Sequence, residues 1–216
     1  PAAKPGARAV RHGPVVAYHS NGRKRSKGVY VDGALHGLWK RWKRSGAKRT
    51  VGAFKQGVRD GPWQFWFRNS TDRGPYAAGT KHGEWTTELY SGGKIVGSYA
   101  AGKQDGAWLT FAKGGQKTSA HLYKQGRPDG TWRGWYGDGK KRVEGSWNNG
   151  RKTGIWRSWH PNGQVQSTTE YTDGSRNGSH VEHYANAKPR AKGSYSNGQR
   201  VGAWTFYFDT GATRAT

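Results

Sequence analysis

The segment from His180 to His183 contains the residues whose types and spacing come closest to a metal site. His180, Glu182 and His183 supply two imidazoles and a carboxylate, which are ordinary ligands of zinc. His180 and His183 are three residues apart, however, so a regular β-strand would place them on opposite faces. They are candidate metal ligands only if a bulge brings them together. We interpret them instead as imidazoles that occupy the two aromatic positions of a degenerate repeat. We expect neither a metal nor a cofactor.

Catalytic groups are not indicated by any pattern in the chain. There is no cysteine, which excludes a thiolate nucleophile and a thiolate metal site. No glycine-rich phosphate loop of the GxxxxGK[ST] or GxGxxG type precedes a helix. Glu84 and Glu88 share one segment without a partner base. Several other carboxylates directly precede glycine, as turn residues do: Asp32, Asp60, Asp105, Asp129, Asp138 and Asp173. We therefore expect a protein that is not an enzyme.

Basic residues are the strongest compositional signal. The chain holds 37 Lys and Arg against 13 Asp and Glu, a net charge of +24. Residues 1–60 carry 15 of these basic side chains and only two acidic ones. Like charges at this density repel each other unless a counter-charge relieves them. Two basic clusters in consecutive units therefore predict one basic patch that binds an anionic partner. The first cluster consists of Arg23, Lys24, Arg25 and Lys27, and the second of Lys40, Arg41, Lys43 and Arg44.

These residues are set in a repeat of about 24 residues. One copy is GTWRGWYGDGKKRVEGSWNNGRKT over residues 130–153, and the next copy opens at Gly154. Such a period is typical of an array of supersecondary units that stack to bury a shared core. We predict an N-terminal extension or cap over 1–12 and a single array over 13–216, with units that start at residues 13, 37, 61, 83, 106, 130, 154, 178 and 202.

Each unit reads as a β-hairpin. Two strand-length pieces of about five residues are rich in Trp, Tyr, Val and Thr, which favour strands. Pairs such as Asp60-Gly61, Asp129-Gly130 and Asn149-Gly150 are typical of tight hairpin turns. No segment shows the 3.6-residue period of a helix. We predict an all-β fold, an elongated twisted antiparallel meander of about 17 short strands.

The periodic aromatic residues predict two columns of rings. One contains Trp39, Trp63, Trp85, Trp108, Trp132, Trp156 and Trp204, and the other contains Tyr30, Phe54, Tyr76, Tyr99, Tyr123, Trp147, Tyr171 and Tyr195. We interpret them as a core, and the alternative is a stacking platform for sugars or bases. Trp132 and Trp135 are three residues apart, so either both faces carry aromatic rings or a bulge at Gly134 brings both to one side.

The pattern Gly-x-Trp-x-x-Trp/Tyr, then Asn-Gly, then Gly-x-Tyr-x-x-Gly at this period resembles MORN repeats, most closely the bacterial variant found in antitoxin-like proteins. The resemblance covers residues 13–216. His36-Gly37 and His82-Gly83 are similar to the family's His-Gly turn, whereas other residues precede the glycine elsewhere, for example Asp60 and Thr153. The resemblance implies elongated sheets of hairpins and a role in scaffolding, protein binding or attachment near membranes, with no common chemistry. The chain also resembles, less closely, the Trp-rich repeats that bind bacterial cell walls.

Three function classes follow from these patterns. The first is a non-enzymatic scaffold that docks onto a partner protein or assembly with an acidic surface. The second is electrostatic binding of a polyanion such as nucleic acid, lipopolysaccharide or an anionic membrane. The third is cell-wall or carbohydrate binding through aromatic rings.

Two expectations concern the ends of the chain. The C-terminal strand, within 203–211, has no proline and one charge, so we expect a partner or a second copy to cover its edge. The opening PAAKPGARAV is typical of a chain just after signal-peptide cleavage. It predicts a periplasmic, cell-surface or extracellular protein, with a cytoplasmic location left open. No apolar run approaches the ~18 residues that span a bilayer.

Overall fold

The computed structural model describes residues 10–215. Residues 1–9 of the predicted cap lie outside this range, so the cap stays a prediction. Internal contacts divide the chain into two compact units. Unit 1 covers the described residues up to Ser91 together with Tyr99–Gly102, and unit 2 covers Gly92–Ser98 and the described residues from Lys103 onward. The array over 13–216 and its unit boundaries also stay predictions.

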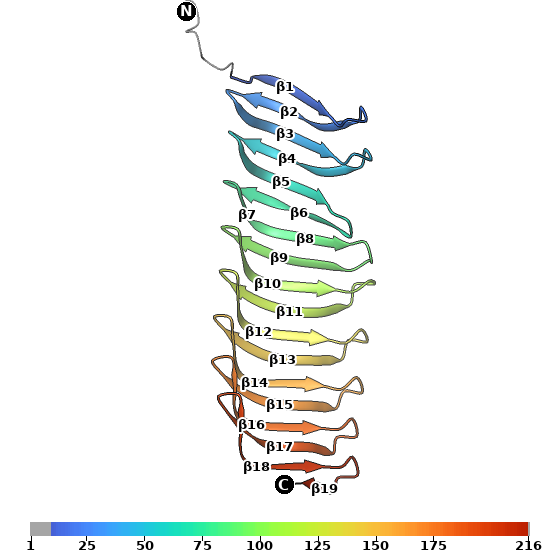
Figure 1. Ribbon diagram of the computed structural model, residues 1–216, viewed down its shortest axis with the longest axis vertical. Coiled ribbons are helices and arrows are strands. Elements are labelled where there is room, and N and C mark those ends of the chain that lie inside the picture. Colours follow the sequence, from blue (N-terminus) through green and yellow to red (C-terminus); the bar gives the residue numbers. More distant parts are fainter. Residues whose placement is uncertain (1–9, 216) are drawn as a thin grey trace, which may run out of the picture. The chain divides into compact units, whose positions relative to one another are not determined.

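Unit 1 is an antiparallel meander of strands that follow one another in the chain (Figure 1). Each of the first six strands pairs with the next, and β6 also pairs with β8 because β7 has only two residues. The strands are β1 (Gly13–Tyr18), β2 (Lys24–Val31), β3 (Ala34–Trp42), β4 (Lys48–Lys55), β5 (Val58–Trp66), β6 (Ser70–Ala77), β7 (Thr80–Lys81) and β8 (Gly83–Leu89).

Unit 2 has the same architecture. Each strand from β10 to β18 pairs antiparallel with the following strand. The residues of β9 (Lys94–Ala100) are divided between the two units. The remaining strands are β10 (Lys103–Phe111), β11 (Lys117–Lys124), β12 (Arg127–Trp135), β13 (Lys141–Asn148), β14 (Arg151–Trp159), β15 (Val165–Thr172), β16 (Ser175–His183), β17 (Pro189–Ser196), β18 (Gln199–Tyr207) and β19 (Thr213–Ala215).

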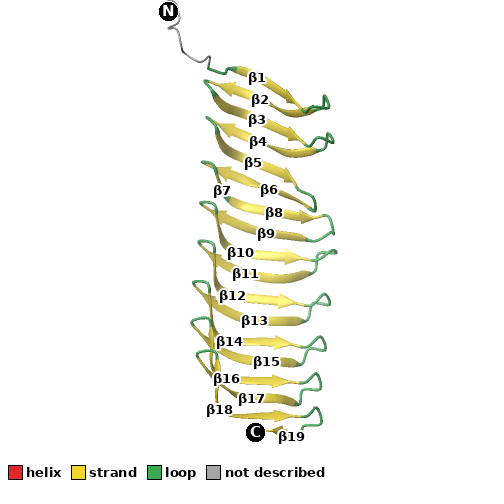
Figure 2. Ribbon diagram, in the orientation of Figure 1, coloured by secondary structure: helices red, strands yellow, loops and turns green. Residues whose placement is uncertain are grey.

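The predicted all-β antiparallel meander is confirmed. Residues 10–215 form strands and loops without any helix (Figure 2), and they therefore contain no helix that could span a bilayer. The described residues form 19 strands, against about 17 predicted, and the difference comes from the short strands β7 and β19. The expected strand length of five residues was wrong, since most strands have seven to nine.

The strands are longer than predicted because one class of turn uses only two residues. At Asp32-Gly33 the backbone angles φ are 47° and 81°, and at Asn149-Gly150 they are 47° and 84°. Positive φ at both central residues is the geometry of a type I′ turn, whose twist matches that of the flanking strands. Strand structure therefore resumes at once, at Ala34 and at Arg151.

Two predicted turns, Asp60-Gly61 and Asp129-Gly130, are instead strand interiors, in β5 and β12. His36-Gly37 likewise lies inside β3. Gly61 has a φ of 70°, and the pairing between β4 and β5 shifts register next to it, between Gly52 and Ala53. The Asp-Gly pair thus correctly predicted a glycine with a positive φ, but this glycine belongs to a β-bulge and not to a turn.

Within each unit, residues of the two predicted aromatic columns alternate in one ladder on one face of the sheet. In unit 1 the ring centroids of Tyr30, Trp39, Phe54, Trp63, Tyr76, Trp85 and Tyr99 follow one another at 5.0–6.4 Å. Most of these contacts are edge-to-face, the arrangement that aromatic quadrupoles favour. In unit 2 the rings of Trp132, Trp147, Trp156 and Tyr171 follow one another in the same way, as do those of Tyr195 and Trp204. We call these rings the aromatic ladder.

The second aromatic residue of a unit lies outside the ladder. Strand alternation places Trp135 on the face opposite Trp132. Its cationic neighbour is Lys117, whose Nζ lies 5.9 Å from the ring centroid. The pairing of β12 with β13 does shift register at Gly134 and Trp135, but it does not bring both rings into the ladder.

Candidate functional site

Each regular step of the ladder places a tryptophan over a glycine of the preceding strand. A Cβ atom added to Gly52 would lie 2.1 Å from the ring of Trp63, and one added to Gly145 would lie 2.2 Å from the ring of Trp156. Only glycine permits this approach. The two indoles also donate from Nε1 to backbone oxygens, Trp63 to Ala53 at 3.0 Å and Trp156 to Ser146 at 3.1 Å.

The tryptophan faces are occupied by the protein itself. Trp63 and Trp85 are only 3% exposed. Trp156 and Trp204 are buried as well, and rings at this burial offer little surface to a sugar or a base, so these four tryptophans belong to the core of the sheet. This observation supports the core interpretation over the stacking platform.

Basic side chains lie over the ladder at a regular spacing. Arg59 Cζ is 4.8 Å from the Trp63 centroid, and Lys81 Nζ is 3.9 Å from that of Trp85. In unit 2, Lys152, Arg176 and Arg200 hold the corresponding places, at 4.3 Å from Trp156, 5.1 Å from Tyr195 and 4.5 Å from Trp204. These distances are within the range of cation–π attraction. We call these five residues the ladder cations.

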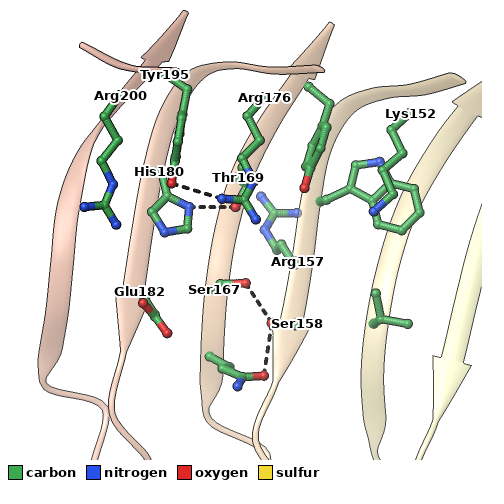
Figure 3. Close-up of a pocket in the computed structure, with 14 residues that line it drawn as sticks. Lys152, Arg157, Ser158, Ser167, Thr169, Arg176, His180, Glu182, Tyr195 and Arg200 are labelled. Atoms are coloured by element: carbon green, nitrogen blue, oxygen red, sulfur yellow. Dashed lines mark hydrogen bonds between the residues drawn. The ribbon is translucent and has the colours of Figure 1, made fainter. Parts of the chain in front are cut away.

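One step of the ladder in unit 2 has no tryptophan. His180 holds the tryptophan position, and Thr169, its register partner on β15, holds the glycine position. Thr169 Oγ1 and His180 Nδ1 share a hydrogen bond of 2.8 Å. Figure 3 shows this bond, with the side chains of Arg176 and Arg200 on either side of His180. Burial is the main cause that lowers the pKa of His180, and the charges of Arg176 and Arg200 lower it further against an opposing effect of Glu182.

A hollow of about 390 Å³ surrounds this irregular step. Lys152, Arg176, His180 and Arg200 line it together with Glu182 (Figure 3). Ser158 and Ser167 also line it, and their hydroxyl oxygens are 2.7 Å apart. The hollow is therefore polar and carries an excess of positive charge.

The candidate metal ligands His180 and His183 have separate surroundings. His180 bonds to Thr169 as described. The Nδ1 atom of His183 is buried without a hydrogen-bond partner, and burial is the main cause that lowers the pKa of this residue. Within the part of the chain that the structure describes, no group of three or more His, Asp or Glu residues could hold a metal ion.

The two predicted basic clusters lie on adjacent strands and loops of unit 1. Lys27 on β2 and Lys40 on β3 are direct register partners. Lys27 and Lys40 are both exposed. At the loop edge, Arg23 donates from Nη1 to the backbone oxygen of Ser45, beside Arg44. The fold thus brings residues of both clusters side by side.

The clusters do not share one face, however. Gly28 lies under Trp39 on the ladder face, so its neighbours Lys27 and Lys40 point to the opposite face by strand alternation. Arg41, the register partner of the buried Ser26, points to the ladder face. The residues of the two predicted clusters are therefore distributed over two faces. Lys27 and Lys40 form a pair on the face opposite the ladder, and other residues of the clusters lie on the ladder face and in the loops.

An apolar hollow of about 530 Å³ lies beside the Lys27–Lys40 pair. Its lining includes Leu38, Val51 and Pro62. Leu38 is two residues from Lys40 on the same strand and therefore shares its face, and 54% of it is exposed. The sequence pattern did not predict an exposed leucine beside Lys40 on this face.

Comparison with known families agrees with the repeat pattern. Residues 128–149 and 152–173 each match the model of the MORN repeat variant. The predicted resemblance is thereby confirmed for two adjacent repeats of unit 2, and these residues form a β-repeat module of a family without catalytic chemistry. No curated protein matches the chain.

Proposed function

We propose that the chain is a non-enzymatic binding module and that unit 1 docks an acidic protein partner through the sheet face opposite the aromatic ladder. The observation that carries this proposal is the position of exposed Leu38 and its apolar hollow next to the Lys27–Lys40 pair.

The paired lysines favour a partner with carboxylates. Like charges directly opposite each other on two strands destabilise a sheet. Neither Lys27 nor Lys40 forms an ion pair within residues 10–215. A partner carboxylate between the two ammonium groups would relieve this repulsion.

The apolar hollow favours a protein over a phosphate polymer. A buried apolar anchor with a charged surround is the usual anatomy of a protein interface. A nucleic acid backbone would use the lysines but would gain nothing from Leu38 and Pro62. The partner we infer presents an apolar side chain flanked by Asp or Glu.

Peptide selection against the intact protein tests this proposal. We expect the enriched peptides to contain an apolar residue flanked by acidic ones. Lys27→Glu/Lys40→Glu and Leu38→Asp should each weaken their binding at least tenfold. Arg41→Glu is the matched control, since it reverses a neighbouring charge on the other face, and it should leave the affinity within about twofold.

The opposite result is also well defined. If no such peptide is enriched while polyphosphate or DNA binds with a steep salt dependence, the polyanion interpretation replaces the protein partner. Binding of acidic peptides that is equally weakened by Arg41→Glu and Lys40→Glu would mean that the face is wrongly assigned.

A further inference from the structure

The irregular step at His180 leaves space that regular steps of the ladder fill. At Gly145–Trp156 and Gly193–Trp204 an indole lies on the backbone of the preceding strand. The Thr169–His180 pair replaces the indole with a smaller imidazole and adds a side chain below it. The hollow of about 390 Å³ opens at this position, and its volume is within the ~300–1,000 Å³ of sites for small molecules.

Three cations surround this hollow without a carboxylate partner. Lys152, Arg176 and Arg200 form no ion pair with any described residue. Lys152 and Arg200 contact aromatic rings, while Arg176 also donates to the Tyr195 hydroxyl at 3.0 Å. The charges are therefore held in place by groups that do not neutralise them.

The one acidic residue in the lining does not alter this balance. Glu182 accepts a hydrogen bond of 2.8 Å from Arg190 Nη1, which compensates its charge. The excess along the hollow is thus three units, from Lys152, Arg176 and Arg200, more than one carboxylate of a ligand would balance.

The opposite wall of the hollow offers neutral hydrogen-bonding groups. Ser158 and Ser167 share a hydrogen bond of 2.7 Å, and the side chain of Gln166 lies 3.3 Å from the Ser158 hydroxyl. Hydroxyls and an amide both donate and accept. They suit the hydroxyl groups of a polyol rather than an apolar group.

We propose that this hollow binds a phosphomonoester of a small polyol, with the phosphate between Arg176 and Arg200, which flank His180 (Figure 3), and the hydroxyl groups toward Ser158 and Ser167. The guanidinium fork matches the phosphate oxygens. A phosphomonoester carries about −1.5 to −2 charges near pH 7, which fits the local excess better than a single carboxylate does.

Calorimetric titration of the full chain with glucose 6-phosphate tests the proposal. We expect saturable one-to-one binding, and glucose alone should not bind. Arg176→Gln and Arg200→Gln should each weaken binding at least tenfold. Arg59→Gln is the matched control, because Arg59 makes the same contacts to an aromatic ring and a tyrosine hydroxyl beside an intact step, Trp63. That variant should bind as the parent does.

A second variant removes the hollow without removing any cation. Thr169→Gly/His180→Trp restores the glycine and tryptophan of a regular step, so it should fold and lose the binding. Retained affinity in this variant would overturn the proposal. So would binding that Arg59→Gln weakens as much as Arg176→Gln does.

Ring NMR of His180 gives an independent signal of the same site. The charged and titratable groups around it are Arg176 and Glu182 on its own strand, Arg200 on β18, Tyr195 on β17 and Lys152 on β14. A bound phosphate offsets the cations, so the pKa of His180 should rise on saturation with glucose 6-phosphate. An unchanged titration on saturation, or binding to phosphatidic acid vesicles without binding to the sugar phosphate, would contradict the proposal.

Discussion

Thr169 and His180 are register partners that together replace the glycine and the tryptophan of a regular step. Their side chains share a hydrogen bond of 2.8 Å, in the place where Gly145 and Trp156 meet one step earlier. A tryptophan at 180 that packs as Trp156 does needs a glycine at 169, because a Cβ atom added to Gly145 would lie 2.2 Å from the Trp156 ring.

This relationship predicts non-additive stability. His180→Trp alone should destabilise the sheet through overpacking by ~1–3 kcal/mol. Thr169→Gly alone should cost a similar amount, since it removes the hydroxyl partner of a half-buried imidazole. The double variant should be at least as stable as the parent, so the coupling energy should be at least the sum of the two single losses, ~2–6 kcal/mol. Urea unfolding of the four proteins measures this, and additive effects would show that the two positions are independent.

The sequence predicted the strands well because the repeat contains strong local signals. Trp132 and its equivalents recur in segments that favour strands, and Asn149-Gly150 has the dihedral preferences of a tight turn. The prediction of a turn at Asp129-Gly130 was wrong, because a glycine with a positive φ occurs in tight turns and in β-bulges alike. Only the pairing between strands distinguishes the two.

The candidate site was harder to predict because it arises between repeats. The sequence marks His180 as an irregular residue of its own repeat, but its partner Thr169 belongs to the preceding repeat. Comparison of the glycine positions 145, 169 and 193 would have revealed it. The 24-residue spacing of Lys152, Arg176 and Arg200 was a similar signal, and it was hidden within a generally basic sequence.

The glycine under each ladder tryptophan predicts a specific sensitivity to a single methyl group. Gly145→Ala should destabilise unit 2 by ~1–3 kcal/mol, because the new Cβ would lie 2.2 Å from the Trp156 ring and must displace it. Gly137→Ala is the control, since no atom lies within 4 Å of its added Cβ. Urea unfolding of both variants provides the comparison. Equal stabilities would mean that Trp156 moves aside without cost.

Trp147 should contribute less to the stability of unit 2 than Trp156 does. Its Nε1 atom is buried without a hydrogen-bond partner, whereas that of Trp156 donates to Ser146. An unsatisfied buried donor costs ~1–3 kcal/mol. Trp147→Phe removes that donor and should therefore be less destabilising than Trp156→Phe by about 1 kcal/mol or more. Unfolding curves for the two variants check the order, and a larger loss for Trp147→Phe would indicate that its nitrogen has an acceptor in solution.

His121 should make the stability of unit 2 dependent on pH. It holds a glycine position of the repeat and stacks on Trp132 with a centroid distance of 3.3 Å. Burial, assisted by the charge of Arg142, lowers its pKa from 6.5 to about 4. The unfolded chain then binds a proton more readily than the folded one, so stability is complete above pH 6.5 and is lost as the pH falls toward 4.

His121→Gly isolates this contribution. The carboxylates and the other histidines titrate in both proteins, so the difference in unfolding free energy between parent and variant reports on residue 121. We expect the unfolding free energy of the parent, relative to that of the variant, to be constant above pH 6.5. It should decrease between pH 6.5 and 4 and level off at lower pH. Because the ring is only half buried, the shift should be on the order of 1 kcal/mol rather than the full value that the pKa change would imply. Urea unfolding at half-unit pH intervals measures it, and a difference that stays constant from pH 8 to pH 4 would mean that His121 is protonated as easily in the folded sheet as in the unfolded chain.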